Sequence, residues 1–254
     1  EAEKGRMPEL LLVLGLSAAL KVFVALNDVV VNADAVLFLA AARELASGHL
    51  AEGLAICPLP AYSALIAAVQ QLIPDGVLAA RALNVAASVL TLIPICLLTS
   101  DLFGRRAAFW AGIALALCPQ HNEMAIEVIR DPLYILCVAW AACLMARGLL
   151  HRRRWPLAAG VLCAWLAVLF RAEGLILLAV SLGLLLAAGC FWRDHRRLAF
   201  EALGWGALPA LAGVGMLIGG FWPQGLTNRL DEVWLRIQDW RNLAFLDNYE
   251  RIYD

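Results

Sequence analysis

Long apolar runs alternate with short polar stretches along most of the chain. A helix needs about 20 predominantly apolar residues to cross the hydrocarbon core of a bilayer. Seven runs meet or approach that length, and arginines beside the shorter ones can snorkel to extend them. These runs are residues 9–27, 78–100, 107–120, 132–150, 155–170, 174–192 and 198–222. The pattern predicts an all-α polytopic membrane protein with seven transmembrane helices.

Another apolar stretch, residues 58–73, is ambiguous because it opens with Pro58 and Pro60. As a helix it would reach only about 24 Å, against roughly 30 Å for the hydrocarbon core. If it lies in the interface, residues 28–80 form one long outer loop. If it crosses, the first loop faces the cytoplasm, opposite the other polar loops. We favour the interfacial interpretation, because it gathers the polar loops on one face.

The arginines define the direction of the spans, since cytoplasmic loops carry an excess of Lys and Arg. Three turns are marked as cytoplasmic in this way by Arg105 and Arg106, by Arg147 and Arg152–Arg154, and by Arg193, Arg196 and Arg197. They alternate with residues 120–131, residues 171–174 and the segment after Trp222. We therefore expect these three segments to face outward.

Two amphipathic segments accompany the spans. Residues 34–50 are typical of a helix lying at the membrane surface, and residues 227–244 place apolar side chains near helical spacing. The predicted organisation is a transmembrane module over residues 1–222 and an outer-face amphipathic segment over residues 223–254. Juxtamembrane helices at about 28–78 would belong to the outer loop of the module.

Composition supports lipid as the solvent for much of the chain. Of the 254 residues, 63% are hydrophobic and the mean hydropathy is +0.77, against roughly 45–50% apolar residues in a soluble domain. The basic residues lie in short loops without an interleaved aromatic platform, so the sequence does not indicate nucleic-acid binding. Seven scattered cysteines contain no CxxC pair and are typical of small packing residues.

Polar residues that could carry chemistry concentrate in the three predicted outer loops, where charge near a membrane is costly unless solvated or paired. The residues are Asp28 and Asp34 in the first loop, His121, Glu127, Arg130, Asp131 and Tyr134 in or after the second, and Arg171 and Glu173 in the third. Purely structural roles are open alternatives. Asp34 and Asp131 could cap helices, and Arg171 with Glu173 could form a solvated turn.

The order of the motifs resembles one family. A first span is followed by Asp34–Phe38 and Ala42–Gly48, then by Pro58–Tyr62, Ala80–Asn84, Leu102–Arg106, Asp131–Leu133 and Arg171–Gly174. In this order and spacing the chain resembles the GT-C membrane glycosyltransferases, in the branch of protein O-mannosyltransferases and lipid A aminoarabinose transferases. The resemblance runs from about residue 10 to 220 and implies a GT-C-like transmembrane catalytic module.

The resemblance implies an enzyme that transfers a sugar, with inversion, from a polyprenyl-phosphate-linked donor to a glycan, lipid or protein acceptor. The reaction would take place at the outer, periplasmic face of a bacterial inner membrane. Asp34 matches the acceptor-activating base, and Asp131 matches a second acidic position that could hold a divalent metal ion with Asp34. Arg171, Arg130 and His121 would stabilise the donor phosphate. The predicted substrate-binding residues are Asp28, Tyr62, Glu127 and Glu173.

Two positions depart from the family pattern. Ala35 follows Asp34 where an acidic pair is typical, and Cys57 stands where relatives often place a basic residue. They leave the metal requirement and the mode of donor binding open. Two other functions stay open as well: a transporter or flippase of a lipid-linked substrate, and a non-catalytic GT-C-like partner subunit. A transporter would more often show internal repeats and helices broken at mid-membrane.

Overall fold

The computed structural model describes residues 6–27, 32–57, 59–192 and 196–218. This part of the chain is built from α-helices and contains no strand, so the predicted all-α class is confirmed. The helices are α1 (Arg6–Asn27), α2 (Ala33–Ala46), α3 (Leu50–Ile56), α4 (Ala61–Gln70), α5 (Gly76–Phe103), α6 (Arg105–Leu117), α7 (Pro119–Ile126), α8 (Asp131–Leu150), α9 (Arg154–Phe170), α10 (Gly174–Phe191) and α11 (Arg196–Ile218).

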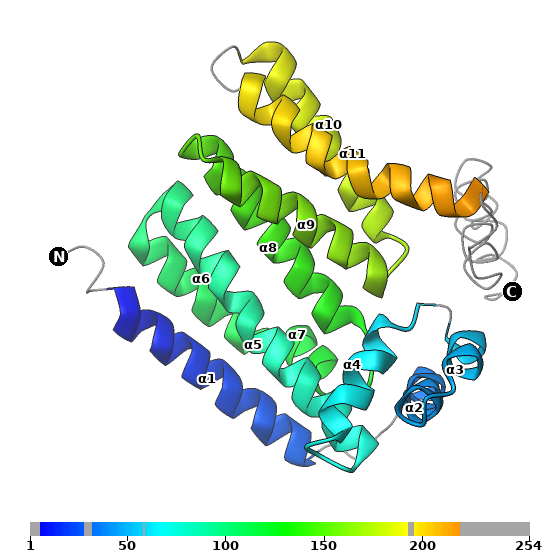
Figure 1. Ribbon diagram of the computed structural model, residues 1–254. Coiled ribbons are helices and arrows are strands. Elements are labelled where there is room, and N and C mark those ends of the chain that lie inside the picture. The colour runs from blue at the N-terminus through cyan, green and yellow to red at the C-terminus, as the bar shows by residue number, and fades with distance from the viewer. Residues whose placement is uncertain (1–5, 28–31, 58, 193–195, 219–254) are drawn as a thin grey trace, which may run out of the picture.

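The long helices form a bundle in which α1, α5, α6, α8 and α9 lie side by side (Figure 1). Four described helices are long and apolar enough to cross a membrane: α1 from Pro8 onward, α5, α8 and α10. Each of the seven predicted apolar runs is helical over most of its length, but α9 has 17 residues and α6 only 13. At 1.5 Å per residue, α6 is about 20 Å long. The count of seven crossings therefore stays a prediction.

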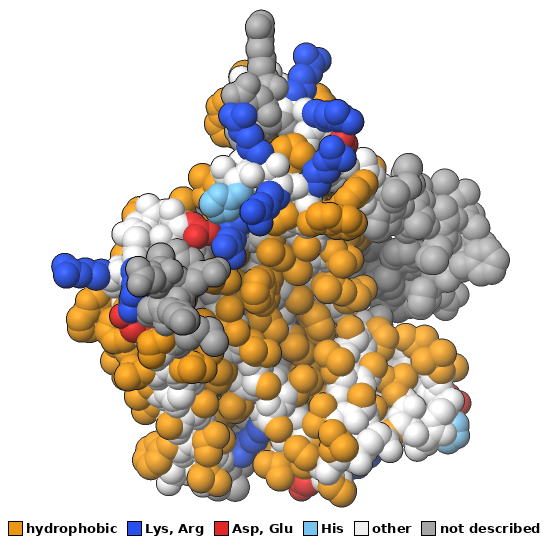
Figure 2. Space-filling view, turned by 60° about the vertical axis from the view of Figure 1, so that its left-hand side comes forward, with side chains coloured by type: hydrophobic (Ala, Val, Ile, Leu, Met, Phe, Trp, Pro, Cys, Tyr) orange, Lys and Arg blue, Asp and Glu red, His pale blue; other side chains and the backbone are white. Residues whose placement is uncertain are grey.

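The surface of the bundle suits a lipid environment. Large hydrophobic side chains such as Phe23, Trp110 and Leu162 are more than half exposed. Figure 2 shows hydrophobic side chains over most of one face, with Lys and Arg side chains gathered toward its upper part. Because apolar side chains gain nothing by facing water, this surface agrees with a multi-pass membrane protein.

Close helix packing inside the bundle depends on small residues. A Cβ added to Gly148 in α8 would lie 2.5 Å from the Leu157 side chain of α9, and one added to Gly160 in α9 would lie 2.5 Å from Met145. The two helices can approach this closely only because neither glycine has a side chain. Small residues at helix contacts are characteristic of packing within membranes.

The short helices α2, α3 and α4 lie together at the end of the bundle where α1 ends and α5 begins (Figure 1). The ambiguous stretch, residues 58–73, forms the ten-residue helix α4, about 15 Å long and too short to cross a bilayer. The amphipathic stretch, residues 34–50, contains α2, which ends before Gly48 at φ +84°. The next helix, α3, was not predicted. Residues 227–244 lie outside the described residues.

The second outer loop, residues 120–131, contains another helix that the sequence did not indicate. Helix α7 begins at Pro119 and packs against α1 and α5, with His121 and Asn122 buried. Nζ of Lys21 in α1 donates to Oδ1 of Asn122 at 2.8 Å and to Oγ of Ser17 at 3.0 Å. These bonds give the buried side chain of Asn122 a partner, so α7 can pack among the other helices.

Candidate functional site

The turn between α9 and α10 places Arg171 between two carboxylates. Its Nε and Nη2 donate to the two carboxylate oxygens of Glu173, at 3.3 and 3.2 Å. Its Nη1 donates to Oδ1 of Asp131, the first residue of α8. The structure thus joins the predicted second and third loops through one guanidinium, whose side chain is 31% exposed.

The turn that carries Arg171 is tight. The backbone N–H of Arg171 donates to the carbonyl of Ala167 at 3.0 Å, and the N–H of Gly174 donates to the carbonyl of Arg171 at 2.9 Å. A Cβ at Gly174 would lie 2.6 Å from the backbone nitrogen of Val168. Only glycine therefore fits at this position, and the close contact fixes the direction in which Arg171 leaves the turn.

A second arginine and two aromatic rings complete the cluster. The guanidinium of Arg171 lies over the ring of Tyr134, 5.8 Å from its centre, and that of Arg130 lies over Phe38 of α2 at 5.9 Å. The hydrogen bonds from Arg171 lower the pKa of the Glu173 carboxyl despite its partial burial, and the charge of Arg130 lowers it further. The site is therefore a cationic pair balanced by two carboxylates.

Asp34 lies in the first turn of α2, the helix whose Phe38 contacts Arg130. It precedes Phe38 by four residues, so the two side chains point to the same face of the helix. Asp34 is exposed, and no ion pair of the described residues engages it. It does not cap α2, because Asn32 is the N-cap and its side chain accepts the backbone N–H of Ala35 at 2.9 Å. The alternative that Asp34 is the helix cap is therefore wrong.

Among the described residues, no hydrogen bond or ion pair joins the remaining predicted site residues to Arg171. His121 is buried in α7, with Nε2 at 3.2 Å from the carbonyl of Ser88; burial, and then the charge of Lys21, lowers its pKa. Glu127 has an exposed side chain just after α7. Tyr62 is fully buried, and burial raises its pKa. Asp28 lies outside the described residues. The substrate roles of these four residues stay predictions.

The buried amide of Asn84 in α5 is part of the site, although sequence reasoning assigned it no function. Its Nδ2 lies 3.0 Å from Oη of Tyr62, 2.7 Å from the carbonyl of Glu127 and 2.8 Å from that of Ile129. The signal available in the sequence was a lone polar amide inside a long apolar run. Such residues in membrane helices generally have a partner or a function.

The donor set does not fit a metal site held by the protein alone. In the described part of the chain, no three His, Cys, Asp or Glu side chains come together as a metal site requires. The Asp131 carboxylate is already bonded to Arg171. The metal role expected for Asp34 and Asp131 stays a prediction.

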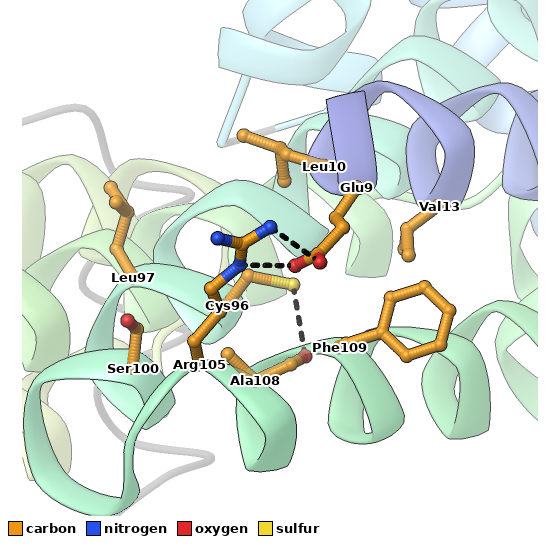
Figure 3. Close-up of a pocket in the computed structure, with 9 residues that line it drawn as sticks. All are labelled: Glu9, Leu10, Val13, Cys96, Leu97, Ser100, Arg105, Ala108 and Phe109. Carbon is orange, nitrogen blue, oxygen red and sulfur yellow. Dashed lines mark hydrogen bonds and ion pairs between the residues drawn. The ribbon is translucent and has the colours of Figure 1, made fainter. Parts of the chain in front are cut away.

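A small hollow of about 60 Å³ lies at the opposite end of the bundle, between α1, α5 and α6 (Figure 3). Its one charged feature is the ion pair of Arg105 and Glu9, with N···O distances of 2.7 and 2.5 Å. The other lining residues are mostly apolar: Leu10, Val13, Cys96, Leu97, Ser100, Ala108 and Phe109. The hollow is lined by a single ion pair, whereas Arg171 links two carboxylates with Arg130 nearby, so we place the candidate site at the Arg171 end.

These features define the class of the protein as a multi-pass helical membrane protein with a charged site at one end of its bundle. The family model of dolichyl-phosphate-mannose-protein mannosyltransferases matches residues 57–214, more than half of the chain, and the chain belongs to that family. It is a membrane glycosyltransferase of the mannosyltransferase type. The matched stretch contains Asp131 and Arg171, whereas Asp34 precedes it. Comparisons with curated proteins and with solved structures found no match.

Proposed function

We propose that the protein transfers a sugar from a polyprenyl-phosphate donor to an acceptor hydroxyl, with inversion, at the end of the bundle where Arg171 lies. The observation that carries the proposal is the position of the Arg171 guanidinium between Asp131 and Glu173, with Arg130 beside it. A planar guanidinium can bind a phosphate through two parallel N–H bonds, which a point charge cannot do. The two arginines suit a lipid phosphate as the leaving group.

In the proposed reaction the acceptor oxygen attacks the anomeric carbon as the bond from that carbon to the phosphate oxygen breaks. The leaving phosphate keeps the electron pair, and Arg171 and Arg130 stabilise the developing negative charge. Asp34 takes the proton of the acceptor hydroxyl as a general base. Attack from the face opposite the phosphate inverts the configuration at the anomeric carbon.

Glu173 and the phosphate would compete for the same edge of Arg171. Glu173 occupies Nε and Nη2, whereas Asp131 occupies Nη1. A phosphate that binds the Nε–Nη2 edge must displace the Glu173 carboxylate, while Asp131 can continue to hold Arg171. Because both members of the Glu173 pair are partly exposed, we expect this exchange to cost at most about 1 kcal/mol.

The test compares wild-type protein with Asp34→Asn in proteoliposomes supplied with radiolabelled polyprenyl-phosphate mannose and native membranes as the acceptor source. We expect roughly a 10²-fold lower rate of label transfer, as is typical for loss of a general base. Thermal stability should not change, because Asn32 is the residue that caps α2.

The matched control is Asp75→Asn. Asp75 caps α5 by accepting the backbone N–H of Leu78 at 2.8 Å, and asparagine caps equally well. Its transfer rate should equal that of the wild type. Near wild-type transfer by Asp34→Asn would move the base to Asp131 or Asp28. A wild-type protein that binds the donor and transfers nothing would favour the partner-subunit alternative.

A further inference from the structure

Asn84 lies where two halves of the candidate site meet. One half is the segment from Glu127 to Asp131, which leads from α7 into α8. Two carbonyls of this segment, those of Glu127 and Ile129, accept from Nδ2 of Asn84. The amide thus holds the backbone immediately before Arg130 and Asp131, two of the charged residues of the site.

The other half is α2, which carries Asp34. Asn84 reaches it through Tyr62 of α4, whose hydroxyl accepts from the same Nδ2 at 3.0 Å. The Tyr62 ring packs edge-on against Phe38 of α2, with ring centres 5.1 Å apart and an interplanar angle of 83°. Phe38 also lies under the guanidinium of Arg130. The contacts therefore form a closed ring from Asn84 through Tyr62, Phe38 and Arg130 back to the carbonyl of Ile129.

This closed ring of contacts depends on the side-chain amide of Asn84. Asn84 is fully buried, and its two amide hydrogens are shared among three oxygens. Its Oδ1 is also buried and has no hydrogen-bond partner among the described residues. A buried acceptor without a partner is costly, whereas an apolar side chain at this position would take the donor away from three oxygens. The donors of Asn84 are used to join three segments that are far apart in sequence.

We propose that Asn84 is a positioning residue that sets the spacing between Asp34 on α2 and the Arg130–Asp131 pair. The inference deepens the proposed function and rests on it for its catalytic consequence. In that reaction Asp34 holds the acceptor hydroxyl and the arginines hold the donor phosphate. The distance between the two substrates therefore depends on the distance between the two halves. A misplacement of about 1 Å can lower a rate on the order of 10²-fold.

The structural part of the test measures the distance between spin labels at positions 36 and 127 by pulsed electron resonance. Both native side chains are exposed, and labels on unnatural ketone-bearing residues leave the native cysteines untouched. In the wild type we expect one narrow distance distribution. In Asn84→Leu, which has a side chain of similar branching but no donor, we expect a broader and shifted distribution.

The matched control is Thr91→Val, in the same helix. Thr91 is fully buried, and its hydroxyl donates to the carbonyl of Ala87 within α5 at 2.8 Å. The Thr91→Val variant loses one buried hydrogen bond without contacting either half of the site, so its distance distribution should match that of the wild type. A second variant, Tyr62→Phe, removes only the hydroxyl and should broaden the distribution less than Asn84→Leu does. Tyr62→Phe decides the question if Asn84→Leu does not fold.

The kinetic part uses unlabelled protein and polyprenyl-phosphate mannose. For Asn84→Leu we expect kcat per folded molecule to fall roughly 10²-fold. The KM of the donor should change much less, because the α9–α10 turn and its Glu173 hold Arg171 even where Asp131 shifts. A residue that only supports the fold would lower the amount of folded protein and leave both constants unchanged.

The outcomes separate this inference from the proposed function. Unchanged distances in Asn84→Leu overturn the inference, whatever the activity, and so does an unchanged kcat with broadened distances. If Asn84→Leu does not fold, wild-type distances in Tyr62→Phe overturn it. If Asn84→Leu broadens the distances and the wild-type protein transfers no sugar, the structural coupling is supported and the proposed glycosyl transfer is rejected.

Discussion

Replacement of Arg171 by lysine tests the chemistry of the site most directly. Arg171 uses three nitrogens in two directions: Nε and Nη2 toward Glu173, and Nη1 toward Asp131. A lysine keeps the charge but presents it as a compact point, so it cannot hold Asp131 and offer a two-donor edge to a phosphate together. We expect a loss of on the order of 2–4 kcal/mol of transition-state stabilisation. This corresponds to a drop of roughly 30-fold to 10³-fold in kcat/KM.

The stability of the protein should change much less. The Arg171 side chain is 31% exposed and that of Glu173 is 40% exposed, so solvent screens their pairing, and the expected cost is about 1 kcal/mol or less. The measurement is therefore kcat/KM for polyprenyl-phosphate mannose beside thermal unfolding in detergent. A large kinetic loss with an almost unchanged Tm supports a contact that matters in the reaction.

Arg105→Lys is the matched control. Arg105 makes the same two-bond contact, with Glu9, at the far end of the bundle (Figure 3), and its replacement should leave kcat/KM at the wild-type value. Comparable losses in both variants would indicate a general effect on the bundle. Unchanged activity in both Arg171→Lys and Arg171→Ala would refute phosphate binding and leave Arg171 and Glu173 as an ordinary turn pair.

Three further predictions address the turn, the competing carboxylate and the topology. Gly174→Ala should lower both Tm and transfer, because its Cβ would meet the backbone of Val168 at 2.6 Å; Gly183→Ala, with nothing within 4 Å of its Cβ, should change neither. Glu173→Gln should lower the KM of the donor, because the pair with Arg171 holds the pKa of Glu173 below its ordinary 4.5 and keeps it a competing anion at neutral pH. The contribution of this pair to the free energy of unfolding is fully present above pH 4.5 and is lost as the pH falls through the lowered pKa of Glu173. In Glu173→Gln the free energy of unfolding should therefore fall less between neutral and acid pH than it does in the wild type. Cysteine labelling at position 48 should occur from the outside, and labelling from the cytoplasm would show that residues 58–73 cross the membrane.

Much of the bundle could be predicted because apolar runs long enough to span a bilayer have few other stable conformations. The helices α5, α8 and α10 follow their predicted runs within a few residues. The contact between Arg171 and Glu173 could also be predicted, since residues two apart in a turn are near each other in any fold. That Asp131 joins them depends on the antiparallel order of α8, α9 and α10, which the alternating charges indicated.

The short helices α3 and α7 could not be predicted, because a helix of seven or eight residues is not stable alone. Their stability comes from tertiary contacts, such as the bond from Lys21 to Asn122, which no local pattern reveals. For the same reason the sequence, which places His121 and Arg130 on one outer face, does not reveal that α7 buries His121 against Ser88 of α5. Asn84 was hidden because its three partners come from positions 22, 43 and 45 residues away.

Two features of the site bear on the depth of Asp34 relative to a bound phosphate. A polyprenyl chain stays in the hydrocarbon, so the phosphate to which it is attached lies near the level of the lipid headgroups. Arg171 and Asp131 stand where α9 ends and α8 begins, and the proposed function requires the phosphate to bind at this level. Helix α2 lies at the same end of the bundle (Figure 1), and Phe38 packs on Tyr62 at 5.1 Å, which fixes the level of Asp34 one turn away. An acceptor deprotonated at Asp34 and a phosphate bound at Arg171 would therefore meet at one depth, although Asp34 precedes the stretch that the family model matches.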